Sequence, residues 1–126
     1  MTSLSSTQRE HLAKMMDERE PVLREEIRDG LRRMRVEGYD ELLSGTSDAG
    51  DESLASLVTD INNADTKRDA VELQDIFAAR ARMAGGTYGI CIDCDVAIPY
   101  ERLEAYPTAK RCLACQQVHE ARRAQR

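Results

Sequence analysis

The stretch Cys91-Ile92-Asp93-Cys94, followed after 17 residues by Cys112-Leu113-Ala114-Cys115, decides how the C-terminal part of the chain folds. Each C-x-x-C pair can turn two thiolates onto one ion, and two such pairs complete a tetrahedron. Because all four ligands would be protein thiolates, no coordination position is left for water. The sequence therefore predicts one structural Zn²⁺ bound by Cys91, Cys94, Cys112 and Cys115, and not a catalytic metal.

Two other chemistries are open to the cysteines. The pairs could be redox dithiols, but the segment lacks the βαβ context of such enzymes. They could also bind iron, which accepts similar sulfur tetrahedra. His119 lies four residues after Cys115, but with four cysteines present we expect it to be a surface histidine.

Upstream of the cysteines, apolar residues recur at helical spacing in two long segments. The first is expected to begin with Ser6 or Thr7 as its N-cap and to extend toward Leu43, with a kink or break near residues 17–21 at Pro21. The second runs from about residue 52 to 84 and ends at Gly85-Gly86. The polar residues between the two segments predict a loop near residues 44–53.

These segments predict a mainly α fold. Residues 1–85 are expected to form a long antiparallel helical hairpin, or coiled coil, with its tip loop near 44–53. Residues 86–126 are expected to form a small four-cysteine zinc module with a short C-terminal helix, whose core would consist of Ile90, Val96, Ile98, Leu103 and Leu113. The polar middle of the second segment, Asp65, Arg68 and Asp69, predicts a solvated or salt-bridged stretch.

Composition and charge exclude several classes of protein. In 126 residues, 33% are charged and only 4% aromatic, which disfavours a large globular core. The formal net charge of −5 argues against an electrostatic nucleic-acid binder. No run of about 18 apolar residues could span a membrane, and the first residues lack a signal-type apolar stretch. We therefore expect a cytoplasmic protein. The sequence has no phosphate loop, nucleophilic triad or open metal site, so we expect it not to be an enzyme.

The cysteine region resembles the DksA/TraR zinc-finger family. The resemblance rests on Gly86-Thr87-Tyr88-Gly89-Ile90 before the first pair, Ile98-Pro99 after it, the run Glu101-Arg102-Leu103-Glu104-Ala105-Tyr106-Pro107-Thr108-Ala109, and the 17-residue spacing. It covers residues 86–118 closely. The helical segments before it fit the same family by architecture.

The resemblance implies a bacterial transcription factor that binds RNA polymerase without binding DNA. In this family the coiled coil enters the secondary channel of the polymerase, and two aspartates at its tip carry the activity. Counting back from Cys91 without gaps places these aspartates on Asp48 and Asp51, and the family's neighbouring alanine on Ser53. Carboxylates at such a tip would make charge-assisted contacts in a basic, Mg²⁺-containing channel.

The same ungapped count from Cys91 also locates the positions that bear on ppGpp, the nucleotide with which DksA itself acts. Asp75, Tyr106 and Gln116 stand where that protein has basic residues. Because an anionic nucleotide gains nothing from Asp75, we expect weak or absent ppGpp synergy.

Two rival hypotheses remain open. In the first, the protein is an adaptor whose coiled coil binds some other protein, so that Asp48 and Asp51 are dispensable. In the second, it is a zinc ribbon that binds nucleic acid, which the net charge of −5 disfavours. An intramolecular hairpin favours a monomer in every case.

Overall fold

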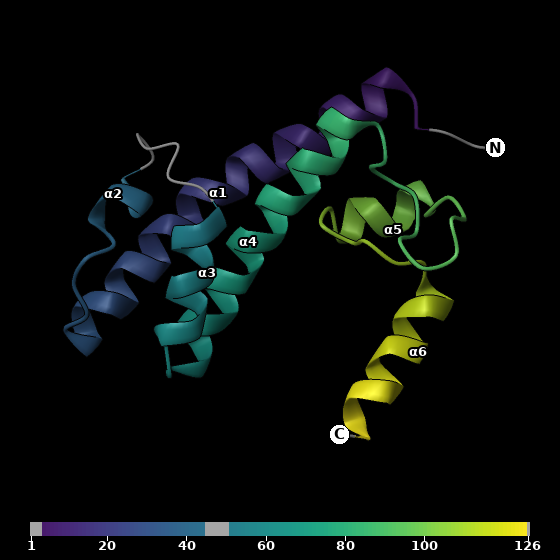
Figure 1. Ribbon diagram of the computed structural model, residues 1–126. Coiled ribbons are helices and arrows are strands. Elements are labelled where there is room, and N and C mark those ends of the chain that lie inside the picture. Colours follow the sequence, from purple (N-terminus) through teal and green to yellow (C-terminus); the bar gives the residue numbers. More distant parts are fainter. Residues whose placement is uncertain (1–3, 45–50, 126) are drawn as a thin grey trace. The chain divides into compact units, whose positions relative to one another are not determined.

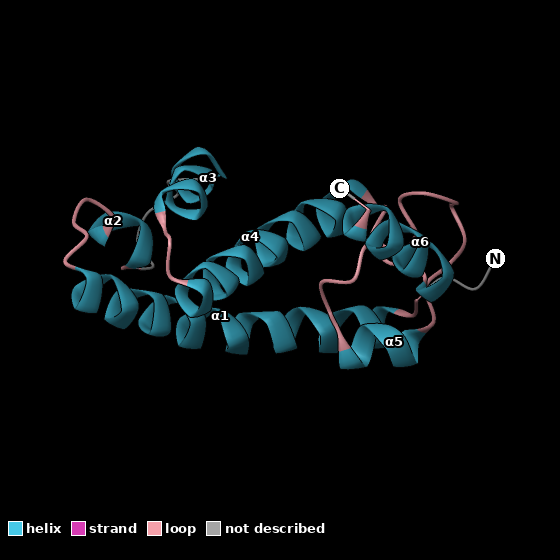
Figure 2. Cartoon of the chain, turned by 90° about the horizontal axis from the view of Figure 1, so that it is seen from below, coloured by secondary structure: helices cyan, strands magenta, loops and turns pink. Residues whose placement is uncertain are grey.

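The structure is a computed structural model that describes residues 4–44 and 51–125 (Figure 1). This part of the chain is mainly helical, as predicted, and Figure 2 shows loops joining its helices. The helices are α1 (Ser6–Met34), α2 (Asp40–Leu43), α3 (Asp51–Asp60), α4 (Ala64–Gly85), α5 (Tyr100–Ala105) and α6 (Leu113–Ala124). They form two compact units, one of residues 16–78 and one that joins the residues before 16 to those from 79 onward.

Helix α1 begins one residue earlier than the sequence suggested, because its cap is Ser5 and not Ser6 or Thr7. The Gln8 backbone N–H donates to Ser5 Oγ at 3.1 Å, and the Ser5 N–H donates to Gln8 Oε1 at 2.9 Å. This reciprocal capping box satisfies two donors at the helix start.

Helix α1 continues through Pro21, so the alternative of a break near residues 17–21 was wrong. The helix ends instead at Met34. Arg35 adopts a left-handed conformation with φ of 58°, and the Val36 N–H donates to the Leu31 carbonyl at 2.9 Å. This is a Schellman end, which normally favours glycine at the position that Arg35 occupies.

The second predicted segment is also divided, into α3 and α4. The side chain of Asn63 accepts a hydrogen bond from the Thr66 backbone N–H at 3.0 Å and thereby caps α4. Helix α4 ends where the sequence predicted, at Gly85, and Gly86 follows with φ of +80°.

The core of residues 16–78 is aliphatic, and within it α1 and α4 run antiparallel (Figure 1). Its buried side chains are Met16, Leu23, Ile27, Leu31, Leu42, Leu43, Leu54, Leu57, Ile61, Leu73 and Ile76. The two helices approach closely at Gly30, where an added Cβ would lie 2.9 Å from Thr66 Cγ2 and closer still to Thr66 Oγ1. Gly30 therefore permits this packing and is more than a weak point in the helix.

Two arginines of α1 bind the C-terminal carbonyls of the short helix α2. Arg24 donates to the Leu42 carbonyl, and Arg28 donates to the Leu43 carbonyl at 2.6 Å. Arg24 is buried, pairs with Glu20 at 2.6 Å and lies over the ring of Phe77. These contacts satisfy carbonyls that a helix leaves without an internal partner.

Asp65 and Arg68 of the polar stretch of α4 are solvated, as predicted, whereas Asp69 is half-buried. Arg68 pairs with Asp65 at 3.4 Å, and both side chains are at least three-quarters exposed. No helix in the described ranges is both long and apolar enough to cross a membrane.

Candidate metal centre

The first cysteine pair lies on a tight loop closed by backbone hydrogen bonds. The Cys91 N–H donates to the Val96 carbonyl at 2.8 Å, and the Asp95 N–H returns to the Cys91 carbonyl at 3.0 Å. Ile90 and Ala97 form an antiparallel bridge at the base of this loop. Such a closed loop turns the side chains of Cys91 and Cys94 to the same side.

The second pair lies at the start of α6. Cys112 is the N-cap residue in an extended conformation, and its carbonyl accepts the Gln116 N–H at 2.9 Å. Cys115 lies within the first turn of the same helix. The helix start therefore fixes the spacing of these two ligands.

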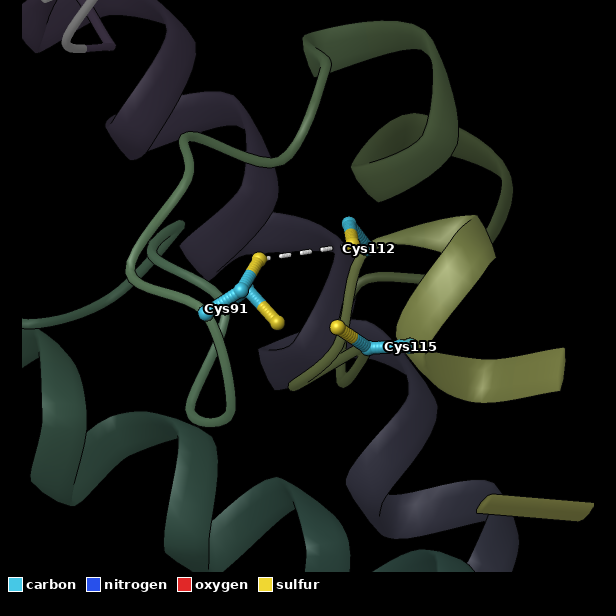
Figure 3. Close-up of side chains that lie close together, drawn as sticks. Cys91, Cys112 and Cys115 are labelled. Carbon is cyan, nitrogen blue, oxygen red and sulfur yellow. Dashed lines mark hydrogen bonds between the residues drawn. The ribbon is translucent and has the colours of Figure 1, made fainter. Parts of the chain in front are cut away.

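The four sulfurs converge on one point. Figure 3 shows Cys91, Cys112 and Cys115 turned toward a common centre from two separate segments. All four Sγ atoms lie within 4.8 Å of one another, and Cys94 Sγ lies 3.8 Å from Cys112 Sγ. A tetrahedron with Zn–S bonds of about 2.3 Å has sulfur–sulfur edges of about 3.8 Å, so the donor set fits zinc.

The thiols differ in burial and in acidity. Cys91 is fully buried, whereas Cys94 is exposed. Burial raises the pKa of Cys91, but backbone hydrogen bonds at Cys112, Cys94 and Asp93 outweigh it and lower the pKa to about 6. The pKa of Cys115 is raised, mainly because its thiol donates hydrogen bonds to the sulfurs of Cys112, Cys94 and Cys91. Four sulfurs this close cannot all ionise unless a cation neutralises them, which is what Zn²⁺ does.

The small core beneath the site differs from the predicted one. Ile98 and Leu103 are buried as expected, together with Tyr88 and Ala109. Val96 and Leu113, however, are 57% and 58% exposed, so their assignment to the core was wrong. Both belong to the ligand-bearing loops, where backbone geometry serves the cysteines and leaves the neighbouring side chains outside.

Two further contacts in the unit that contains the zinc site were not predicted from the sequence. His11 Nε2 lies 3.5 Å from a carboxylate oxygen of Glu104, and the buried Tyr88 hydroxyl donates to the Pro107 carbonyl at 2.6 Å. Burial raises the pKa of Tyr88 to about 12. No sequence signal pairs His11 with Glu104, because they lie 93 positions apart in the chain. His119 is not part of the sulfur cluster and is half-buried on α6.

The predicted tip residues are only partly within the described chain. Asp48 lies outside the described residues. Asp51 is the first residue of α3, and Ser53 is exposed on that helix. Of the positions discussed for ppGpp, Tyr106 is 52% exposed and Gln116 Nε2 donates to Glu120 Oε1 at 3.0 Å.

Sequence comparison places the metal centre in a known class. Residues 86–121 match the prokaryotic dksA/traR C4-type zinc finger. An 8.2 kDa protein in the gpA 5′ region of Escherichia phage P2 is 45% identical over 49 residues, which are 39% of this chain and 66% of the phage protein. General stress protein 16O of Bacillus subtilis is 40% identical over 63 residues, which are 48% of this chain and 39% of that protein.

Comparison of the fold reaches further along the chain. The transcription factor DksA2 from Pseudomonas aeruginosa has a TM-score of 0.65 at 22% identity, covering 95% of this chain and 88% of that chain. The DnaK suppressor protein from Agrobacterium tumefaciens has a TM-score of 0.53 at 22% identity, covering 94% and 99%. The sulfur geometry and the matched zinc finger together establish one structural zinc ion in the C-terminal module.

Proposed function

We propose that this chain, which belongs to the DksA/TraR family of four-cysteine zinc-finger proteins, regulates transcription by binding bacterial RNA polymerase. The observation that carries the proposal is the coincidence of the matched zinc finger at residues 86–121 with a DksA-like fold over 95% of the chain. The regulator acts in the cytoplasm, as a monomer and without enzymatic activity. It binds the polymerase and not DNA.

The mechanism follows the family expectation. The paired helices enter the secondary channel of the polymerase, so that Asp48 and Asp51, the first residue of α3, lie near its active centre. Carboxylates in a channel lined with basic residues and Mg²⁺ gain from charge-assisted contacts. Ser53 lies on the exposed surface of α3, within reach of a partner. Bound in this way, the protein changes the lifetime of promoter complexes.

The charge of the chain supports a protein partner over a nucleic acid. The formal net charge is −5, whereas sequence-independent binding to DNA or RNA depends on clustered lysines and arginines. The same argument favours weak ppGpp synergy, because Asp75 would repel an anionic nucleotide and neither Tyr106 nor Gln116 supplies a positive charge.

The test begins with binding of the zinc-loaded chain to bacterial core RNA polymerase. Promoter-complex lifetime is then measured with the wild type and with Asp48→Asn/Asp51→Asn. We expect the wild type to bind and shorten the lifetime, and the double variant to bind equally well without any effect on it. A charge-matched control, Glu37→Gln/Glu41→Gln, removes two exposed carboxylates before the tip and should behave as the wild type.

Two results would contradict the proposal at different levels. Absence of binding would remove polymerase as the partner and favour a zinc-stabilised adaptor for another protein. Binding with an unaltered effect of the double variant would retain the partner and refute the role of Asp48 and Asp51. Strong enhancement by ppGpp that requires position 75, 106 or 116 would refute the expected lack of synergy.

A further inference from the structure

An ion pair joins the two ligand-bearing loops of the zinc site. Asp93 lies between Cys91 and Cys94, and Arg111 directly precedes Cys112. The Arg111 Nε donates to Asp93 Oδ2 at 2.8 Å. The side chain of Arg111 is only 12% exposed, whereas that of Asp93 is 46% exposed. The pair therefore connects one loop to the other beside the metal ligands and independently of the metal.

A third segment, helix α5, also contacts Arg111. Arg102, on α5, donates from Nε to the Arg111 carbonyl at 3.1 Å. In parallel with the ion pair, the Ile92 N–H donates to the Lys110 carbonyl at 2.9 Å. The Asp93–Arg111 ion pair thus reinforces a backbone contact between the same two loops. The backbone of Arg111 is itself held in place by Arg102.

Separation of the two loops would open the metal site. Two thiolates come from each loop, so movement of one loop away from the other removes two ligands at once and gives a chelator access to Zn²⁺. Because Cys94 is exposed, solvent and a chelator can reach the site from at least one side. The contacts that keep the loops together therefore limit how often the site opens.

We propose that Asp93 and Arg111 form a clasp that retains zinc by holding the two cysteine loops together. Both are positioning residues, since neither is a metal ligand. The proposal rests on the zinc site alone and does not depend on polymerase being the partner.

A purely electrostatic role makes a different prediction, which allows the clasp to be tested. A site of four thiolates and one Zn²⁺ carries two negative charges. If only charge mattered, removing the carboxylate of Asp93 would stabilise the metal site, while removing the Arg111 guanidinium would weaken it. If the clasp matters, both removals should accelerate zinc release, because either one removes one partner of the same ion pair.

The experiment uses the full zinc-loaded chain. Zinc release into excess EDTA is followed at neutral pH for the wild type, Asp93→Asn, Arg111→Gln and the double variant. Asp95→Asn is the matched control, because Asp95 follows Cys94, is exposed and has φ of 65°, which asparagine also tolerates. The visible spectrum of the Co²⁺-loaded chain reports whether tetrahedral sulfur coordination is preserved.

We expect Asp93→Asn and Arg111→Gln each to accelerate release by about 3- to 10-fold, a modest effect beside the 10- to 100-fold that groups bonded directly to ligands exert. The double variant should release zinc no faster than the faster of the two single variants, and Asp95→Asn should match the wild type or release more slowly. The Co²⁺ spectrum should stay tetrahedral throughout, which a variant with a misfolded module would not show. Release from Asp93→Asn that is as slow as from Asp95→Asn, or additive effects in the double variant, would overturn the clasp.

Discussion

Large aliphatic side chains differ in their solvent exposure between the two parts of the molecule. Among the described residues of the unit 16–78, those of the core are exposed by 4% or less, and Val22 is the one large aliphatic side chain that is exposed, at 46%. In the zinc module, Ile92, Val96, Leu113 and Val118 are each between 48% and 58% exposed. The first region is held by burial of apolar surface, and the second has too little buried surface to hold its loops without the metal.

The contrast shows how one short chain combines two sources of stability. Helix α6 contributes no buried residue to the module, yet its first turn supplies two of the four zinc ligands. The metal therefore holds α6 in place, as the burial of an apolar stripe holds α1 and α4 in place. Four predictions test that division, from the largest expected effect to the smallest.

Removing zinc should separate the two regions most clearly. We expect chelation, or the Cys91→Ser substitution, to collapse the amide NMR signals of residues 88–112 while those of the core of residues 16–78 keep their positions. Structural zinc contributes about 10 kcal/mol or more to folding in small zinc modules, which far exceeds what the few buried side chains here can replace. Dispersed signals from residues 88–112 in the zinc-free protein would contradict the contrast.

The Gly30→Ala substitution should affect only the apolar region. Its new methyl group would meet Thr66 on α4, and such overpacking costs about 1–3 kcal/mol in the free energy of unfolding. We expect a value at the upper end, with zinc affinity unchanged, as measured by urea unfolding and metal competition.

Two variants serve as controls for Gly30→Ala. Gly85→Ala adds the same methyl group to a helical position with nothing within 4 Å, so it should not destabilise. Adding Thr66→Ala to Gly30→Ala removes the two closest atoms and should restore most of the loss. If Gly30→Ala were as stable as the wild type, the close approach of α1 and α4 would be refuted.

The Arg24→Met substitution tests the polar contact within the apolar core. It would leave the Leu42 carbonyl without its donor and remove the pair with Glu20, at a cost of about 2 kcal/mol. Arg33→Met, on the exposed side of α1, should be nearly neutral. Equal urea midpoints for the two variants would show that the buried arginine adds nothing beyond its hydrophobic stem.

Asp69→Asn should produce the smallest change, and in the stabilising direction. Burial, followed by the negative charge of Glu26, raises the pKa of Asp69 above its usual value. An acid whose pKa is raised on folding contributes stability at low pH that is lost as the pH rises through the folded pKa. At neutral pH the ionised group is therefore unfavourable, and Asn should gain about 0.3 kcal/mol, the scale of a like-charge pair on a helix surface.

The pH dependence provides the check on Asp69. The advantage of the Asn variant should shrink as the pH falls through the raised pKa of the Asp69 carboxyl, because the protonated group loses its unfavourable charge. Asp65→Asn is the control, because that side chain is 86% exposed and pairs with Arg68. A gain in stability that persists at low pH would point to a cause other than ionisation.

The sequence was sufficient for the zinc ligands and the mainly helical class, because both rest on local patterns. Spacing alone identifies Cys91 and Cys112 with their partners, and the Gly85-Gly86 step marks the end of α4. The helix interruptions were harder to predict. The left-handed residue at the end of α1 is Arg35, which carries none of the glycine signal that usually marks such a position.

Contacts between distant segments could not be predicted from the sequence. A buried arginine such as Arg24 resembles any charged helix residue until the carbonyl of Leu42 is known to face it. The ion pair of Asp93 with Arg111 depends on how the two cysteine loops are turned, which spacing does not determine. The exposure of Val96 and Leu113 has the same origin, since hydrophobicity alone assigned them to a core that the loops do not form.

The unit that contains the zinc site is assembled from both ends of the described chain. Leu4 packs against Gly89, and His11 faces Glu104, whereas the unit of residues 16–78 is continuous in sequence. During synthesis, which proceeds from the N-terminus, the continuous unit can fold as soon as it leaves the ribosome. The first turns of α1 must wait for partners made some 85 to 93 residues later. All four zinc ligands are present only once Cys115 has been made, so complete metal capture follows the synthesis of the continuous helical unit.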